Sequence, residues 1–194
     1  MRELAHENGY HLAPGVIPVR GMELLGQWIC DDPAFAISHT RSLPRIVDLA
    51  HKIIGPDLCD TGEAVVHYNP TNIYGDWHYD IPWNSADGGV IPCWRFAVYF
   101  QDYTKFSGAL AVMPGSHLGN VDFFDPVIAH VIASQPGDVV IWNLRTMHQP
   151  NTTIPGLPHA PGRNAIIFDY AAPGVDVERY RAWRLPKRVA EGRA

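Results

Sequence analysis

The stretch most informative about the fold is SGALAVMPGSHLGN, residues 107–120, which lies in the second half of the 194-residue chain. It begins with a short apolar run, typical of a buried strand, and continues with Pro-Gly-Ser, which is typical of a turn. Similar short runs flank it on both sides, namely EAVVHYN (63–69), IPCWRFAVYFQD (91–102), VIAHVIAS (127–134), GDVVIWN (137–143) and RNAIIFDY (163–170). Short strands at this spacing predict a sandwich or a barrel.

The first sixty residues carry a helical pattern instead. In RSLPRIVDLAHKIIGPD, residues 41–57, apolar side chains recur at helical spacing up to Gly55-Pro56. This pattern predicts a helix that ends there. A second, shorter helix is predicted in GMELLGQWIC, residues 21–30.

The composition is that of a globular domain rich in turns. The chain has 17 glycines and 17 prolines, which favours many short elements over a helix bundle. No linker of distinct composition divides it. We expect one mainly β domain with flanking helices, made of a helical N-terminal part (1–60), a β core (about 63–170) and a C-terminal tail (171–194).

Charge and cysteine content exclude several classes of partner. A formal net charge of −5 and the lack of a basic patch argue against nucleic-acid or anionic-membrane binding. The three cysteines, Cys30, Cys59 and Cys93, form no close-spaced pair, so neither a disulfide framework nor a CxxC zinc site is indicated. The apolar runs fall short of the roughly 20 residues that span a membrane. We expect a cytoplasmic protein, monomeric or homodimeric.

The stretch GDWHYDIPWN, residues 75–84, contains the first candidate metal ligands. If it is extended, His78 and Asp80 project from the same face, so that both can reach one cation. A chain with this many histidines and aspartates contains roughly one His-x-Asp by chance, so the pair alone is a weak signal.

Two later residues strengthen the metal hypothesis. His148 follows a predicted strand and could be a third ligand. Two histidines and one carboxylate on one face of a metal leave open coordination positions, as in non-haem Fe(II) oxygenases. Arg163 begins the last predicted strand. Its planar guanidinium is suited to bind a carboxylate with two hydrogen bonds, such as the distal carboxylate of a 2-oxo diacid.

The stretch 107–120 resembles the Gly-Ala-Leu-x-Val-x-Pro-Gly-Ser-His signature of the phytanoyl-CoA dioxygenase-like (PhyH) family. The resemblance covers roughly residues 63–170, with the His-x-Asp pair, His148 and Arg163 in the family's order. It implies a double-stranded β-helix, a jelly roll of cupin-like type. It also implies Fe(II) held by His78, Asp80 and His148, with 2-oxoglutarate, held by Arg163, and O₂ as co-substrates.

The resemblance also assigns secondary roles. His117 is not a ligand in this family, and we expect it to make a structural hydrogen bond. The family often has Ser or Thr two residues after the second histidine, where this chain has Pro150. Further candidates for contact with 2-oxoglutarate are Thr152, Tyr68 and His67.

Two residues are candidates for substrate contact. Trp83 lies in the loop that follows the His-x-Asp pair, where an aromatic ring could meet a substrate. Arg95 is unusual in an otherwise apolar strand, and it is expected either to form a buried ion pair or to bind a substrate carboxylate.

The resemblance implies a dioxygenase that hydroxylates, desaturates or cyclises a small-molecule metabolite. A carboxylate at Asp80 favours these outcomes over halogenation, which needs an open halide position on the metal. Two alternatives remain: a cupin-like metalloenzyme that does not use 2-oxoglutarate, and a non-catalytic jelly-roll binding module.

Overall fold

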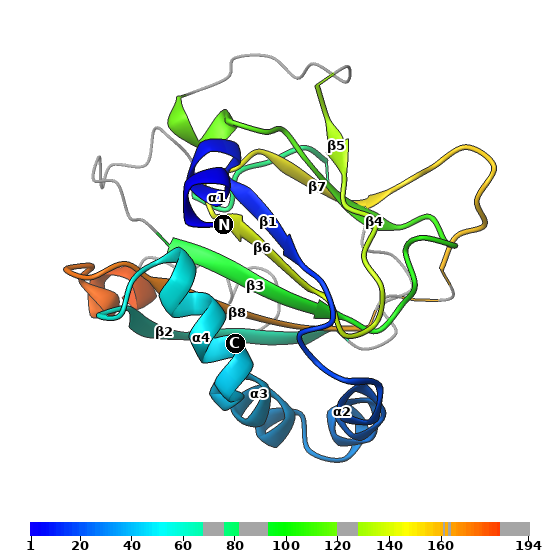
Figure 1. Cartoon of the computed structure of the whole chain (residues 1–194), viewed down its shortest axis with the longest axis horizontal. Coiled ribbons are helices and arrows are strands. Elements are labelled where there is room, and N and C mark those ends of the chain that lie inside the picture. The colour runs from blue at the N-terminus through cyan, green and yellow to red at the C-terminus, as the bar shows by residue number, and fades with distance from the viewer. Residues whose placement is uncertain (68–75, 82–92, 120–127, 161, 163, 183–194) are drawn as a thin grey trace.

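Two antiparallel sheets form the β part of the protein (Figure 1). The computed structural model describes residues 1–67, 76–81, 93–119, 128–160, 162 and 164–182. The larger sheet has the order β1 (Tyr10–Ala13), β6 (Val139–Asn143), β3 (Cys93–Tyr99), β8 (Ala165–Ala171) and β2 (Cys59–His67). The smaller sheet has the order β5 (His130–Val131), β4 (Ala109–Val112) and β7 (His148–Thr152).

Strand alternation gives the larger sheet two different faces. On β3, Phe96 and Val98 belong to an apolar cluster that includes the helices, whereas Ala97 and Tyr99 belong to a second cluster. The second cluster also contains Val112 of the smaller sheet, so the two sheets pack face to face. Because successive side chains of a strand point to opposite faces, each central strand contributes to both layers.

Helices cover the outer face of the larger sheet (Figure 1). They are α1 (Arg2–Asn8), α2 (Val19–Asp31), α3 (Pro33–Ser42) and α4 (Pro44–Ile53). Helix α4 buries Ile46, Leu49, Ala50 and Ile53, the face that its periodicity predicts. The helices predicted in residues 21–30 and 41–57 are therefore present.

Helices α1 and α3 are additional to the sequence prediction. Pro33 occupies the first turn of α3, and the Asp32 side chain accepts a hydrogen bond from the Phe35 backbone N–H at 3.0 Å. This is a regular N-terminal cap. The apolar pattern of α3 is weak because it buries only Ala36 and Thr40, which explains why periodicity missed it.

The strands also differ from the sequence prediction in three places. Strand β1 lies within the N-terminal part, which was expected to be helical, and pairs with β6. Strand β7 was not expected, and β5 covers two of the described residues 128–134 of the predicted segment 127–134. Strands this short carry too little alternation to be recognised, and neighbouring strands define them.

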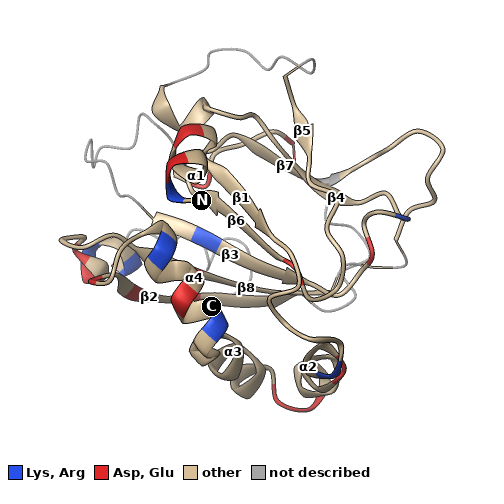
Figure 2. Cartoon of the chain, viewed as in Figure 1, with Lys and Arg blue, Asp and Glu red and all other residues tan. Residues whose placement is uncertain are grey.

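Charged residues lie mainly on the helices and loops, and the central strands carry few (Figure 2). In the three central strands β6, β3 and β8 the charged side chains are Arg95 and Asp169. Separately, none of the helices within the described ranges combines the length and the apolar character that a membrane span requires.

Candidate metal centre

A two-residue bridge brings the two candidate histidines together. The backbone N–H of His78 donates to the His148 carbonyl at 3.0 Å, and the N–H of His148 donates to the His78 carbonyl at 3.0 Å. Residues paired in this way project from the same face. The ring centroids of the two histidines are accordingly 4.3 Å apart.

Asp80 completes a group of three potential ligands. Its Oδ2 atom lies 3.5 Å from Nε2 of His148. One ligand atom from each of His78, Asp80 and His148 can be chosen so that all three lie within 4.8 Å of one another. Among the described residues this is the group with the composition and spacing of a metal site. His148 is buried, Asp80 is half-buried and His78 is exposed, so the group opens toward solvent on the His78 side.

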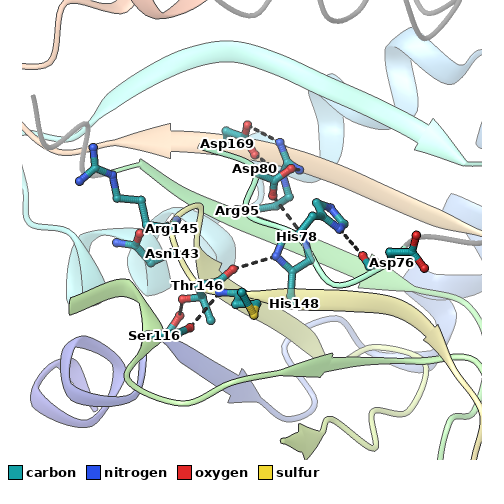
Figure 3. Close-up of polar contacts among 12 residues, drawn as sticks. Asp76, His78, Asp80, Arg95, Ser116, Asn143, Arg145, Thr146, His148 and Asp169 are labelled. Carbon is teal, nitrogen blue, oxygen red and sulfur yellow. Dashed lines mark hydrogen bonds and ion pairs between the residues drawn. The ribbon is translucent and has the colours of Figure 1, made fainter. Parts of the chain in front are cut away.

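Backbone carbonyls fix the orientation of both imidazoles (Figure 3). Nδ1 of His78 lies 2.7 Å from the Asp76 carbonyl oxygen, and Nδ1 of His148 lies 2.9 Å from the Thr146 carbonyl oxygen. A carbonyl oxygen only accepts hydrogen bonds, so each Nδ1 carries the proton. Each Nε2 therefore keeps its lone pair for a metal, which is the usual arrangement of ligating histidines.

Burial keeps His148 neutral. It lowers the pKa of His148 to about 4, because a desolvated ring resists a positive charge, and the Asp80 carboxylate opposes this shift only in part. At neutral pH the ring is therefore a neutral donor. Two imidazoles and one carboxylate form the donor set of the 2-His-1-carboxylate iron sites.

Arg95 connects Asp80 to a second buried carboxylate. Its Nη1 donates to Asp80 Oδ1 at 2.8 Å, while its Nε and Nη2 donate to the two oxygens of Asp169 at 2.7 and 2.9 Å. Burial alone would lower the pKa of Arg95, but Asp169 and then Asp80 raise it well above its ordinary value. Of the two roles expected for Arg95, the structure contains the buried ion pair.

Asp169 is a residue of this site that the sequence reasoning missed. It accepts a further hydrogen bond, at 2.9 Å, from the hydroxyl of Tyr180 in the helical segment 177–182. One signal could have revealed it, because a lone carboxylate in the apolar run AIIFDYA of β8 needs a buried partner. Arg95, the lone charge of a neighbouring strand, is that partner.

The signature stretch supports the strand that carries His148. Gly115 has φ 77°, in the left-handed region that favours glycine, and allows the turn. The Ser116 hydroxyl donates to the Met113 carbonyl at 2.6 Å and accepts from the backbone N–H of Met147, next to His148, at 2.8 Å. The motif is therefore a brace for the start of β7.

His117 makes the structural hydrogen bond expected of it. Its Nε2 lies 2.7 Å from the His6 carbonyl oxygen, which connects the signature stretch to α1. His117 is not part of the metal-site group.

The remaining predicted site residues fall into two groups. Arg163, Tyr68 and Trp83 lie outside the described residues. His67 ends β2 and pairs with Ala165 of β8. Thr152 ends β7, and its hydroxyl oxygen is buried without a hydrogen-bond partner among the described residues.

Comparison with known proteins agrees with the sequence resemblance. The pattern of the family "Phytanoyl-CoA dioxygenase (PhyH)" matches residues 18–153. An ectoine dioxygenase of Nocardia farcinica (strain IFM 10152) is 35% identical over 79 residues, which is 38% of this chain. The matched region is 26% of that relative, so the similarity extends over about a quarter of its length.

Solved structures share the fold at low sequence identity. EvdO2 from Micromonospora carbonacea var. aurantiaca has a TM-score of 0.65 at 17% identity, covering 88% of this chain and 89% of that one. EctD from S. alaskensis, with 2-oxoglutarate and 5-hydroxyectoine, has 0.66 at 18%, covering 88% and 74%. HygX from Streptomyces hygroscopicus, with nickel, 2-oxoglutarate and hygromycin B, has 0.60 at 14%, covering 90% and 88%. The expected jelly-roll fold is thereby confirmed.

Proposed function

Because this chain belongs to the phytanoyl-CoA dioxygenase (PhyH) family, we propose that it is a non-haem Fe(II)- and 2-oxoglutarate-dependent dioxygenase. The observation that carries the proposal is the group His78, Asp80 and His148. Both Nδ1 atoms there are engaged by backbone carbonyls, so that two Nε2 atoms and one carboxylate are available at a common point.

These residues fit a divalent iron better than a closed structural metal site. Structural zinc is held by four protein ligands, whereas the described residues offer three at this point. Three ligands leave positions for a chelating 2-oxo acid and for O₂. When bound, Fe(II) would use O₂ and 2-oxoglutarate to oxidise a substrate C–H bond, giving hydroxylated product, succinate and CO₂.

Two buried polar atoms, one beside His148 and one at the end of its strand, fit a second, polar ligand. Nε1 of Trp142 and Oγ1 of Thr152 are buried without hydrogen-bond partners among the described residues. The Trp142 ring lies 5.5 Å from that of His148, measured between centroids. An unpaired buried donor is costly, so such atoms suggest a ligand. We propose that the Thr152 hydroxyl contacts 2-oxoglutarate. On the sequence pattern, we propose that Arg163 binds the distal carboxylate of 2-oxoglutarate.

The protein's own residues contribute orientation and exclusion of water. Asp80 would supply one negative charge to a bound cation, and Arg95 holds the Oδ1 atom of that carboxylate. Trp142, Val112 and Ile167 belong to the apolar cluster between the two sheets. Next to such apolar side chains, electrostatic interactions with bound charges are stronger than in water.

We propose a small-molecule metabolite as the substrate, with hydroxylation as the outcome. Two proteins of similar fold support this class, since HygX was solved with hygromycin B and EctD with 5-hydroxyectoine. We further propose that the whole chain is one domain and that it works in the cytoplasm. The three free cysteines suit that reducing compartment.

The test is anaerobic loading with Fe(II) and 2-oxoglutarate, followed by O₂ and measurement of succinate across a panel of small metabolites. We expect Fe(II)-dependent succinate release that rises with the correct substrate. Asp80→Ala should abolish it, while Asp48→Ala, which removes an exposed helix carboxylate paired with Lys52, should not. Iron binding without any consumption of 2-oxoglutarate would instead support a cupin-like enzyme. Absence of stoichiometric iron binding would support a binding module.

A further inference from the structure

Arg95 is placed by register to act on the metal carboxylate. On β3 it lies opposite Asp169 of β8 on one side and Trp142 of β6 on the other. Its guanidinium carbon lies 5.9 Å from the centroid of the Trp142 ring. The side chain of Arg95 is 13% exposed and that of Asp169 is 1% exposed, so the pair is largely shielded from water.

The fork of the guanidinium divides its hydrogen bonds unequally. Asp169 receives two of them through Nε and Nη2, and Asp80 receives one through Nη1. Planar, bidentate pairing gives Arg95 a fixed direction, which a lysine could not reproduce. The remaining bond therefore reaches Asp80 from one defined side.

The consequence for Asp80 is that its two oxygens have different environments. Oδ1 is engaged by Arg95 at 2.8 Å, whereas Oδ2 is the oxygen that lies 3.5 Å from Nε2 of His148. A carboxylate held in this way presents one oxygen to the cation. A carboxylate free to rotate could bind through both oxygens and occupy a position that a co-substrate needs.

Asp169 also determines how strongly Arg95 competes with the metal for Asp80. Two hydrogen bonds from Arg95 and one from Tyr180 hold Asp169 in place, and the Thr61 hydroxyl donates to its backbone carbonyl at 2.8 Å. Because Asp169 receives two of the three hydrogen bonds from Arg95, Asp80 shares the guanidinium with a second carboxylate. Without Asp169, Asp80 would be the nearest counter-ion of Arg95.

We propose that Arg95, held by Asp169 and Tyr180, is a positioning residue that fixes Asp80 so that a single carboxylate oxygen faces the metal. The inference rests on the proposed function, because it requires a metal between the two histidines and Asp80. It predicts that the buried Arg95–Asp169 pair contributes to metal affinity as well as to the free energy of unfolding.

The decisive variant is Arg95→Lys, which preserves the charge and removes the fork. Co(II) is titrated into metal-free protein and followed by its visible absorption. We expect one Co(II) per chain for the native protein and an affinity about 10-fold lower for the variant, the lower end of the usual loss for residues supporting a ligand. The band shape should change as well, because the carboxylate changes its mode of binding.

The matched control is Arg41→Lys. Arg41 is an arginine of similar burial, with a side chain 14% exposed, and it forms an ion pair with Asp60. We expect its Co(II) affinity and spectrum to be those of the native protein. An equal loss in both variants would overturn the proposal, because it would indicate general destabilisation.

A pair of variants separates positioning from simple charge. Arg95→Met removes a positive charge and Asp169→Asn removes a negative one, so a charge effect alone would strengthen Co(II) binding in the first and weaken it in the second. Positioning predicts weaker binding in both. Opposite changes would overturn the proposal, and if Arg95→Met does not fold, the Arg95→Lys result decides.

The outcomes also distinguish this inference from the proposed function. If native protein binds no stoichiometric Co(II) or Fe(II), the proposed function fails and the inference fails with it. If native protein binds the metal and Arg95→Lys binds it with unchanged affinity and spectrum, the inference alone is wrong.

Discussion

The two faces of the larger sheet use the same strands for different purposes. Phe96 pairs with Phe168 across β3 and β8, and their stacked rings, 5.8 Å apart, pack toward the helices. One residue away, Arg95 pairs with Asp169, and these charges face the candidate metal centre. The outer face supplies apolar burial, and the inner face supplies fixed charge.

This difference shows why the register of the two strands matters. A shift of one residue would exchange the faces, placing Arg95 among the helices and Phe96 beside Asp80. The apolar contacts of the outer face therefore hold the charged pair in place, although they touch no ligand. Substitutions on the two faces should accordingly separate stability from metal binding.

The largest expected effect is loss of the metal at the inner face. His148→Ala removes a buried ligand, and we expect turnover to fall by more than about 100-fold, since residues that merely support ligands are worth 10–100-fold. Succinate release and Co(II) titration measure it. Retention of either at the native level would show that His148 is not a ligand.

On the outer face, Phe168→Ala should have the opposite profile. Phe168 is fully buried beneath the helices, and its removal should cost about 3–5 kcal/mol of unfolding free energy because a cavity remains. Urea denaturation measures the loss. The Co(II) affinity of the folded fraction should equal that of the native protein. A clear loss of Co(II) affinity would contradict the separate roles of the two faces.

Acid should destabilise the metal-free protein through the inner face. The pKa of His148 is about 4 in the folded chain and about 6.5 when unfolded, so the unfolded state binds more protons between these values. Stability contributed by neutral His148 is thus present above pH 6.5 and lost as pH falls toward 4, by about 3 kcal/mol in total. Denaturation at several pH values measures it. His148→Ala should show a correspondingly smaller pH dependence, and an identical one would contradict the assignment.

The smallest effect concerns the brace that joins the signature stretch to β7. Ser116→Ala removes the hydroxyl that donates to the Met113 carbonyl and accepts from the Met147 N–H. The part-buried Met147 N–H loses this partner, whereas the Met113 carbonyl keeps the backbone N–H of Ser116 at 3.2 Å. We expect a loss of about 1–3 kcal/mol in unfolding free energy. A reduced Co(II) affinity should accompany it, because Met147 precedes His148. Thermal unfolding and Co(II) titration measure the two, and unchanged values in both would show that the brace is dispensable.

Much of the fold was predictable because its signals are local. The apolar runs of β3, β6 and β8 and the amphipathic face of α4 each repeat over several residues. Strands β1 and β7 were not predictable, since four or five residues with His, Pro or Asn carry no clear period. Their pairing with longer strands defines them.

The three candidate ligands could be identified from the sequence, whereas the residues that hold them in place could not. His78, Asp80 and His148 were singled out by residue type, and the structure brings them together. Asp169 and Tyr180 gave no motif, because their importance depends on Arg95, which is 74 residues before Asp169. Register and burial, which are properties of the folded sheet, create that relationship.

The β-rich class, the family signature and the chemical types of the candidate ligands can be read from the sequence alone, because they depend on residue identity and short spacing. The folded structure adds which nitrogen of each histidine is available to a metal. It also shows that Arg95 binds the Oδ1 atom of Asp80. Hydrogen bonds set these choices: each histidine donates to the carbonyl two residues before it, and Arg95 donates to Asp80, 15 residues before it. They form only once the strands pack and exclude water, when each buried polar group must find a partner.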